Sequence, residues 1–493
     1  MKTLRMMLTF AAMLAAATLA AQTNVQIVGT SEGAAGKTIE LYCYEDMLSG
    51  GEVLLDVAEI DSTGAFRLGC YVTYPRLVFV QVENYSQSFY IEAGRHYRVF
   101  LPDFDWNIDE KRNIHLAPVA LPLEFIGVGD DELNIRIGRF DAVVDSFIDS
   151  NRVWFDKKYK PNKRYMDSLS SELKRRGVAP KSLDANGVTF YDRYAEYSMG
   201  ELKLAMRSQS RGKLIGQYIA DQPIRYYDEP YMRLFFALYA NSISQGTRRV
   251  PQWRLSAWIE EGNYDRYMDS IGLDPLLKNE RIRELAVLEA LKESYYDRNY
   301  NRERVKEMVA MLAERTRFEE HRTLANHLLA MMQRGESGFE MPDFTLPDVD
   351  RNMVNLEDMR GKWIYLSFVR VDDPNSLKEI ETMAFFRDSV YANNPDVEFV
   401  TVACDREFQK MYHLLKNSRR GARYNWTWLH FDGNYKLLEH YEVVSYPTFV
   451  LLDPDGKLFY SVTPPPASGI LMRGPWVKKK EVPDSKSDDR FRF

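Results

Sequence analysis

The residues with the widest range of chemistry in this 493-residue sequence are its three cysteines, Cys43, Cys70 and Cys404. A thiolate attacks disulfides and peroxides, and a Cys-x-x-Cys pair cycles between dithiol and disulfide. None of the cysteines belongs to such a pair, and no group of cysteines and histidines has the spacing of a zinc site. The seven histidines are scattered along the chain, so the sequence predicts no metal site and no bound cofactor.

The second place where chemistry is expected is a polar turn, residues 370–376 (RVDDPNS). The apolar run 363–369 before it predicts a buried strand, and the residues from Pro374 to about 391 predict a helix. Asp373 stands directly before Pro374, which favours a helix that begins with a carboxylate cap and a proline in its first turn. Ser376 offers a hydroxyl, and neither side chain can replace a thiolate in disulfide exchange.

Composition and charge place the chain among ordinary globular proteins. Hydrophobic residues make up 45% and charged residues 28% of the chain. The net charge of -6 gives no basis for predicting nucleic acid as a partner, because nucleic-acid binding needs a basic face.

Residues 1–22 have the pattern of a cleaved secretory signal peptide. Lys2 and Arg5 form a short basic start, an apolar stretch follows, and small residues surround Ala20. No later stretch is long and apolar enough to cross a bilayer, so no transmembrane segment is expected after cleavage. Export implies an oxidising compartment, where disulfides persist.

Residues 23–119 are predicted to form an antiparallel β-sandwich domain. Residues 38–43 alternate apolar and polar side chains, and residues 77–82 form an apolar run rich in β-branched residues. Turn signals separate such stretches, as in small antiparallel domains. Cys43 and Cys70 are both expected to point inward, which leaves two interpretations open: a structural disulfide between them, or two separate buried thiols.

Residues 120–334 are predicted to form a helical region. Apolar residues recur there with the period of a helix, and charged residues occupy the positions between them. No fixed repeat length indicates a regular solenoid, and no catalytic motif is recognisable. We therefore expect a helical spacer or a module that binds a partner.

Strands alternate with helices in residues 339–463, which predicts an α/β domain with a parallel core. The expected strands are 363–369, 397–404, 448–452 and 458–460, and the expected helices are 374–391, 407–417 and 435–441. A closing hairpin through the turn Asp453-Pro454-Asp455-Gly456 makes the expected sheet mixed. Residues 464–493 are polar and charged and are expected to form a loose tail.

Short motifs follow one another through this α/β region in a fixed order. They are Asp343-Phe344-Thr345-Leu346, Asn355-Leu356, Gly361-Lys362-Trp363, Phe368, Lys378-Glu379-Ile380, Tyr446-Pro447-Thr448-Phe449 and Asp455-Gly456-Lys457. In order and spacing this set resembles the thioredoxin-like superfamily, above all its exported thiol-disulfide oxidoreductases and the alkyl hydroperoxide reductase/thiol-specific antioxidant group. The resemblance covers about a quarter of the chain. It implies an α/β thioredoxin fold, a periplasmic location and a cis peptide bond before Pro447, beside the polar turn.

The polar turn is where the sequence departs from this family. Relatives carry Trp-Cys-x-x-Cys before Lys-Glu-Ile, and counting back from Lys378 places the tryptophan position on Asp372. The two cysteine positions fall on Asp373 and Ser376, so both sulfur atoms are missing. The resemblance therefore implies that the fold is kept, whereas disulfide exchange and peroxidase chemistry, which need a thiolate here, are lost.

The favoured hypothesis is therefore a module that binds a protein or peptide partner and is not an active thiol-disulfide oxidoreductase. Asp373 either caps the helix alone or contacts a partner together with Arg370 and Asp372. By resemblance, Tyr446 and Pro447 offer a backbone edge to an extended segment; the other interpretation is a tight turn needed for folding.

The competing hypothesis keeps a redox role, as a thiol-disulfide oxidoreductase or antioxidant enzyme of the cell envelope. It places a lone reactive thiol at Cys404, at the end of the predicted strand 397–404. The simpler interpretation of Cys404 is a small buried core residue. The number of reactive thiols on the native and the unfolded protein separates the two hypotheses.

Overall fold

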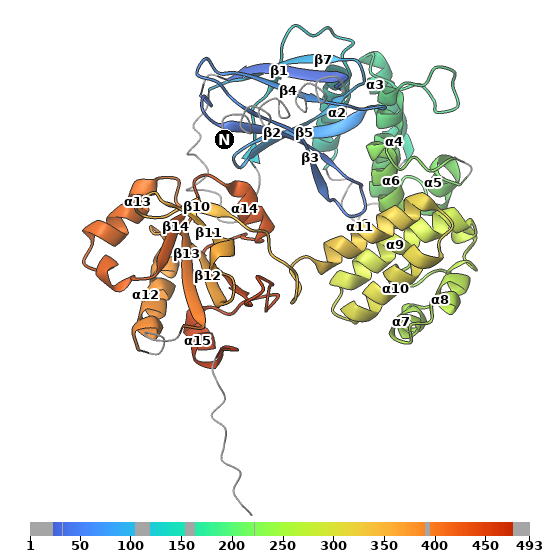
Figure 1. The fold of residues 1–493 in the computed structure, drawn as a ribbon. Coiled ribbons are helices and arrows are strands. Elements are labelled where there is room, and N and C mark those ends of the chain that lie inside the picture. Colours follow the sequence, from blue (N-terminus) through green and yellow to red (C-terminus); the bar gives the residue numbers. More distant parts are fainter. Residues whose placement is uncertain are drawn as a thin grey trace, which may run out of the picture. The chain divides into compact units, whose positions relative to one another are not determined.

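The structure, a computed structural model, describes residues 23–31, 33–103, 119–152, 163–220, 222–389 and 395–476. These residues form two compact units, a first unit that ends at Met332 and a second unit that begins at Gln333. The first unit contains the β-rich and helical regions, and the second contains the α/β region (Figure 1). The expected signal peptide and the part of the tail beyond Trp476 lie outside the described residues.

The N-terminal part of the first unit is built from β-sheets. The strands are β1 Val25–Ser31, β2 Thr38–Tyr44, β3 Glu52–Glu59, β4 Ala65–Cys70, β5 Arg76–Val82, β6 Tyr85–Ile91, β7 His96–Leu101, β8 Val119–Ala120 and β9 Glu124–Phe125. One sheet has the strand order β4-β1-β7-β9 and the other the order β3-β2-β5-β6-β8. Phe66, Leu68 and Cys70 alternate with more exposed residues along β4 and point into the core. The predicted strand-rich region is confirmed.

The prediction that these strands are antiparallel throughout is wrong. β1 pairs in parallel with β7, with Ile27 opposite Tyr97, and β6 pairs in parallel with β8. Five strands separate β1 from β7 in the sequence. A connection of that length permits parallel pairing, whereas a tight turn joins only antiparallel neighbours. Both sheets are mixed for this reason.

The rest of the first unit is helical, as predicted. Its α-helices are α2 Leu133–Ser150, α3 Lys163–Arg175, α4 Phe190–Ala205, α5 Arg211–Tyr218, α6 Glu229–Tyr239, α7 Gln252–Glu260, α8 Tyr264–Ile271, α9 Glu280–Tyr296, α10 Arg302–Arg315 and α11 Glu319–Gln333. Consecutive residues from Glu284 to Leu288 are buried, so α9 is covered on all sides. None of the helices among the described residues combines the length and the apolar character needed to span a bilayer.

Side chains of the sheets and the helices interlock inside the first unit. Tyr90 on β6 packs against Phe190 of α4 and donates a hydrogen bond to Glu229 of α6. Nδ1 of His327, on α11, lies 2.8 Å from a carboxylate oxygen of Asp46 in the β2–β3 turn. Because such contacts join the strand-rich and helical regions, the two are packed against each other as one unit.

The second unit is built around a four-stranded sheet. Its elements are the hairpin β10 Thr345–Pro347 and β11 Met353–Asn355, the sheet strands β12 Trp363–Val369, β13 Val397–Ala403, β14 Thr427–His430 and β15 Thr448–Leu452, and the helices α12 Pro374–Ser389, α13 Phe408–Tyr412 and α14 Tyr435–His440. The strand order is β14-β13-β12-β15. β12, β13 and β14 are parallel, and β15 is antiparallel to β12. The predicted α/β domain with a mixed sheet is confirmed.

Side chains of β12 alternate between the two faces of this sheet. Leu366 and Phe368 lie in one apolar cluster with Leu437 of α14. Tyr365 lies in another, with Met383 of α12. Because both faces are covered, β12 is apolar at nearly every position, which explains the continuous apolar run in the sequence.

Four elements differ from the prediction, and two of them are the unexpected hairpin strands β10 and β11. β14 is absent from it because Thr427–His430 is short and mixes polar with apolar residues. The predicted strand 458–460 does not form, and Leu458 makes an isolated bridge to Leu452 instead. The antiparallel strand β15, rather than a closing hairpin, makes the sheet mixed.

Residues 464–476, which the sequence assigns to a loose tail, pack on the second unit. They contain a turn of 3-10 helix at Pro466–Ser468 and the short helix α15 Ile470–Arg473. Ile470, Leu471 and Trp476 are buried in the same apolar cluster as Tyr365. Burial of these apolar side chains favours an ordered position for a segment that is otherwise polar.

Candidate functional site

The candidate site lies at the carboxyl ends of the parallel strands β12, β13 and β14, the edge at which open α/β sheets bind ligands. The polar turn follows β12, Cys404 follows β13, and His430 ends β14. The antiparallel register sets Phe368 of β12 opposite Thr448 of β15. Pro447 therefore lies beside the start of the polar turn, and its peptide bond with Tyr446 is cis, as the resemblance implies.

The two positions that carry cysteine in relatives are hydrogen-bonded to each other. A carboxylate oxygen of Asp373 accepts hydrogen bonds from the backbone N–H of Ser376 at 2.7 Å and from its hydroxyl at 2.8 Å. The Ser376 oxygen in turn accepts from the backbone N–H of Arg370 at 3.3 Å, and the Ser376 side chain is fully buried. Asp373 thus caps α12, as its place before Pro374 predicts, and Ser376 ties the turn together.

Replacing Asp373 by alanine is expected to lower the free energy of unfolding of the second unit by about 1 kcal/mol, because α12 loses its cap. The control is Asp373→Asn, which keeps an oxygen that accepts the Ser376 N–H and is expected to stay close to the wild type. Hydrogen exchange of the α12 and β12 amides, measured on the full chain, reports this free energy. An equal loss in both variants would show that the charge, not the cap, stabilises the helix.

Cys404 is not the accessible thiol that the redox hypothesis requires. Its side chain is only 5% exposed, and its S–H donates to the carbonyl of Val402 at 3.5 Å. Burial raises the pKa of Cys404 well above its ordinary value, against a smaller lowering by a hydrogen bond from Tyr446. A thiol in such surroundings stays protonated and is a poor nucleophile.

In the structure Cys43 and Cys70 are both free and buried, which agrees with the second interpretation, two separate buried thiols. Cys43 lies on β2 and Cys70 on β4, which belong to different sheets, and each fills the core as a small apolar residue. Burial raises the pKa of Cys43, and it raises the pKa of Cys70 to about 11.

A thiol reagent such as dithionitrobenzoate is expected to modify none of the three cysteines of the native protein within minutes. All three are expected to react after denaturation in guanidinium, because unfolding exposes them and restores ordinary thiol pKa values. Rapid reaction of one native thiol, lost in Cys404→Ala, would contradict the burial of Cys404.

Charged side chains surround the polar turn. Asp372 accepts two hydrogen bonds from the Arg370 guanidinium, at 3.0 and 2.9 Å, and one from the Lys410 ammonium at 3.0 Å. Partial burial opposes ionisation of Asp372, but these hydrogen bonds hold its pKa below the usual value. Arg370 and Asp372, both predicted as contact residues, are therefore brought together, with Lys410 as a partner that the sequence does not reveal.

Asp405 is a buried carboxyl group directly behind the polar turn, and sequence reasoning missed it. One of its oxygens accepts the backbone N–H of Val371 at 2.8 Å. The other, Oδ1, has no hydrogen-bond partner among the described residues and lies 3.9 Å from Nζ of Lys410. Burial raises the pKa of Asp405 to about 6. The sequence did contain a signal for a site residue here, because Asp405 directly follows the correctly predicted strand 397–404.

His430 closes the back of the site. Its Nε2 lies 2.7 Å from the carbonyl oxygen of Asp405, so this nitrogen carries the proton that it donates. Burial lowers the pKa of His430, which favours the neutral ring. Around the polar turn the described side chains therefore offer hydrogen bonds and paired charges, and no thiolate.

Comparisons with known proteins found one matching family profile and several similar proteins. The profile described as "AhpC/TSA family" matches residues 338–461. Thiol-disulfide oxidoreductase ResA of Bacillus subtilis is 26% identical over 141 residues, which cover 29% of this chain and 75% of ResA.

Solved structures of similar proteins each cover about a quarter of the chain. The thioredoxin domain of a thiol-disulfide oxidoreductase from Bacteroides vulgatus is 22% identical and covers 25% of this chain and 86% of that chain, with a TM-score of 0.22. A thiol:disulfide interchange protein from Bacteroides sp. is 23% identical and covers 25% of this chain and 79% of that chain, also with a TM-score of 0.22. From the profile and the similarity to ResA, residues 338–461 are a thioredoxin-like domain of the AhpC/TSA family, homologous to thiol-disulfide oxidoreductases but without a cysteine pair.

Proposed function

We propose that the thioredoxin-like domain binds an extended segment of a protein or peptide partner at the edge beside the polar turn, without thiol chemistry. One observation carries this proposal: the two redox positions, Asp373 and Ser376, are hydrogen-bonded to each other while the fold around them is intact. A domain that keeps its recognition edge but has no nucleophile there can still hold a substrate-like segment.

The side chains around this edge suit a peptide of mixed character. Val444, in the loop before β15, is 62% exposed and offers an apolar contact. Arg370, Asp372 and Lys410 form an ion-paired cluster whose members are partly exposed and able to exchange partners. Exposed ion pairs contribute little to stability, so opening them for a ligand costs little. Apolar contact combined with backbone pairing is the usual mode of recognition of an extended segment.

A selection of displayed random peptides on the full chain tests the binding proposal. Peptides selected on the wild type are expected to bind Val444→Asp at least about tenfold more weakly, because a buried unpaired carboxylate opposes the apolar contact. The matched control is Val462→Asp, at an exposed valine that follows β15 rather than preceding it. Equal binding to both variants, or no peptide enriched above background, would refute a recognition edge at this loop.

The redox alternative is tested separately by insulin reduction with dithiothreitol. The wild type and Cys404→Ala are both expected to give only the background rate, because Cys404 is buried and stays protonated. Activity in the wild type that disappears in Cys404→Ala would replace the binding proposal by a one-cysteine mechanism.

The location of the protein is part of the proposal. Residues 1–22 have the pattern of a secretory signal, which supports export to the periplasm or cell envelope. Fractionation of cells with N-terminal sequencing of the mature protein tests it, with a new N-terminus near residue 22 as the expected result.

The arrangement of the N-terminal strands is proposed as a β-sandwich. Inward-facing apolar residues on both sheets, such as Ile27 on β1 and Leu41 on β2, support face-to-face packing of the two sheets.

A further inference from the structure

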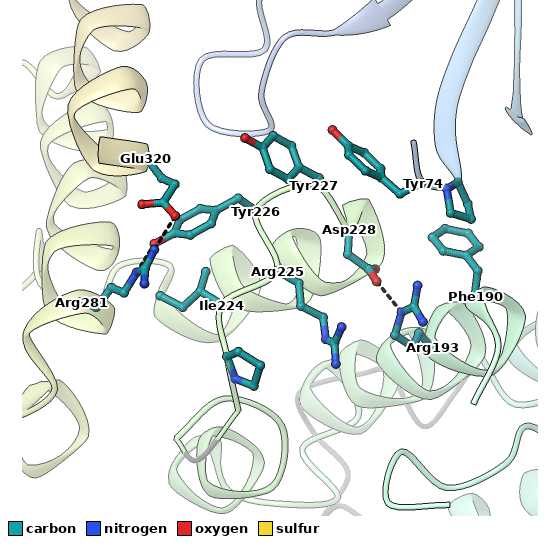
Figure 2. A pocket seen from close by; sticks show the side chains of 12 residues that line it. Tyr74, Phe190, Arg193, Ile224, Arg225, Tyr226, Tyr227, Asp228, Arg281 and Glu320 are labelled. Atoms are coloured by element: carbon teal, nitrogen blue, oxygen red, sulfur yellow. Dashed lines mark hydrogen bonds and ion pairs between the residues drawn. The ribbon is translucent and has the colours of Figure 1, made fainter. Parts of the chain in front are cut away.

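A cavity of about 480 Å³ opens in the first unit, far in sequence from the thioredoxin-like domain. Tyr74, in the β4–β5 loop, lines it together with Phe190 of α4, the segment that leads into α6, and residues of α9 and α11 (Figure 2). This volume falls within the range of small-molecule sites. We propose that the cavity binds a small aromatic monoanion, of the chemical class of the aromatic carboxylates.

The charge of the lining favours an anion. Three arginines face two carboxylates, which leaves an excess of one positive charge. Arg193 is paired with Asp228 at 2.5 Å, and Arg281 of α9 is paired with Glu320 at 2.6 Å. Within the described part of the chain, Arg225 pairs with no carboxylate. Its guanidinium is the group left to receive a ligand anion.

Arg225 and Arg193 both line the cavity. Burial raises the pKa of Tyr197, and the two guanidinium groups both oppose that rise. Arg225 is exposed, so its hydrogen bond with that phenol is open to exchange for a ligand. Two guanidinium groups and the single carboxylate of Asp228 in this part of the lining favour one further negative charge.

Aromatic side chains form the walls and suit a ring. Tyr74 and Tyr227 stack with their centroids 5.1 Å apart, and Figure 2 shows them along one side of the cavity, with Phe190 beyond. Figure 2 shows Tyr226 between Tyr227 and the pair of Arg281 and Glu320. A planar ligand gains contact area against such faces at little entropic cost.

A buried chain of hydrogen bonds fixes the back of the cavity. The Tyr226 hydroxyl accepts from the Arg281 guanidinium at 2.9 Å and lies 2.8 Å from Nε2 of His321. Nδ1 of His321 lies 2.7 Å from the Glu284 carboxylate, which also accepts from Thr316 at 2.6 Å. His321 is 0% and Glu284 4% exposed. Burial of polar groups is costly unless they are satisfied, so this chain holds Tyr226 and Arg281 in place before any ligand arrives.

The protonation of Tyr226 agrees with this role. Burial raises its pKa to about 12, although the Arg281 guanidinium opposes the rise, so the phenol stays neutral. It then contributes a hydrogen-bonding hydroxyl and no second negative charge to the wall. The two carboxylates, Asp228 and Glu320, disfavour ligands with several negative charges, which selects a monoanion over a nucleotide or a polyphosphate.

The test is calorimetric titration of the full chain with 2-naphthoate. Saturable binding at one site is expected, with affinity that falls as salt is added, because the contact is partly ionic. Arg225→Gln is expected to weaken binding at least about tenfold, which corresponds to about 1.4 kcal/mol. Arg249→Gln, at another exposed arginine of the first unit, is the matched control and is expected to bind like the wild type.

The neutral analogue 2-naphthylmethanol separates recognition of the charge from recognition of the ring. It is expected to bind much more weakly than 2-naphthoate, and inorganic phosphate is expected not to compete. Three results would each overturn the proposal: no saturable binding of 2-naphthoate, equal binding by Arg225→Gln and the wild type, or equal affinity for the neutral analogue. Circular dichroism checks that the variants are folded. Tyr227→Ala is a second, independent variant, which removes one aromatic side chain from the cavity lining. The cavity belongs to the first unit and the peptide-binding edge to the second. A negative result for 2-naphthoate binding would therefore not contradict the proposed peptide binding.

Discussion

Cysteines introduced together at the two redox positions, as Asp373→Cys with Ser376→Cys, are expected to give the protein insulin-reducing activity above its background. The first new thiol stands at the amino end of α12, where the helix dipole lowers the pKa of a thiol. A larger fraction of reactive thiolate follows at neutral pH. The second thiol replaces Ser376, whose hydroxyl already contacts residue 373, so the two sulfur atoms are placed to form a disulfide.

The matched controls for this gain of function are the two single variants, Asp373→Cys and Ser376→Cys. Each lacks the second sulfur and is expected to stay at the background rate of the dithiothreitol assay. Thiol counting on the oxidised double variant should find two fewer thiols than on the reduced protein. A double variant that forms no disulfide would contradict the expectation that residues 373 and 376 lie close enough to be bridged.

Asp405→Asn is expected to remove a pH-dependent destabilisation of the second unit. The folded pKa of Asp405 lies at about 6, above the ordinary 3.8 of an unfolded chain. Well below pH 3.8 the carboxyl is protonated in both the folded and the unfolded state and does not lower the free energy of unfolding. As the pH rises from about 4 to about 6 the unfolded chain loses this proton first, so the wild type loses about 3 kcal/mol of its free energy of unfolding.

Asparagine has no such titration and keeps an oxygen that accepts the Val371 N–H. Its advantage over the wild type is therefore expected to grow by about 3 kcal/mol between about pH 3 and about pH 7.5. Hydrogen exchange of the β12 amides across this range measures the difference. Other charges near Asp405 are those of Arg370, Asp372 and Lys410, and all are retained in the variant.

The control for this pH dependence is Asp455→Asn, at an exposed turn of the same unit. Its difference from the wild type is expected to stay constant with pH. A constant difference for Asp405→Asn as well would mean that Asp405 is ionised in the folded state throughout the range, and that Lys410 compensates its burial.

The predictions for the thioredoxin-like domain and for the cavity concern different residues of different units. Loss of peptide binding in Val444→Asp tests only the proposed site at the loop before β15. Loss of 2-naphthoate binding in Arg225→Gln tests only the cavity in the first unit. A protein that passes both tests carries two binding sites without a thiolate in either.

The sequence by itself determined that the polar turn contains no cysteine. Asp373 and Ser376 occupy the positions at which the resemblance implies cysteine, and residue types are read directly from the chain. The cap of α12 was also predictable, because Asp373 and Pro374 act on the helix that they begin. Likewise, the apolar run of β12 predicted a buried strand, since the pattern depends only on neighbouring residues.

The tertiary structure decided which distant residues meet. The parallel pairing of β1 with β7, the position of Asp405 behind the polar turn, and the burial of Cys404 depend on segments that are far apart in the chain. The cavity draws its lining from a strand loop and several helices in the same way. Local sequence patterns determine whether a segment forms a helix or a strand. The burial and the pKa of a side chain depend on the groups packed around it, and these are brought together only by long-range pairing of segments.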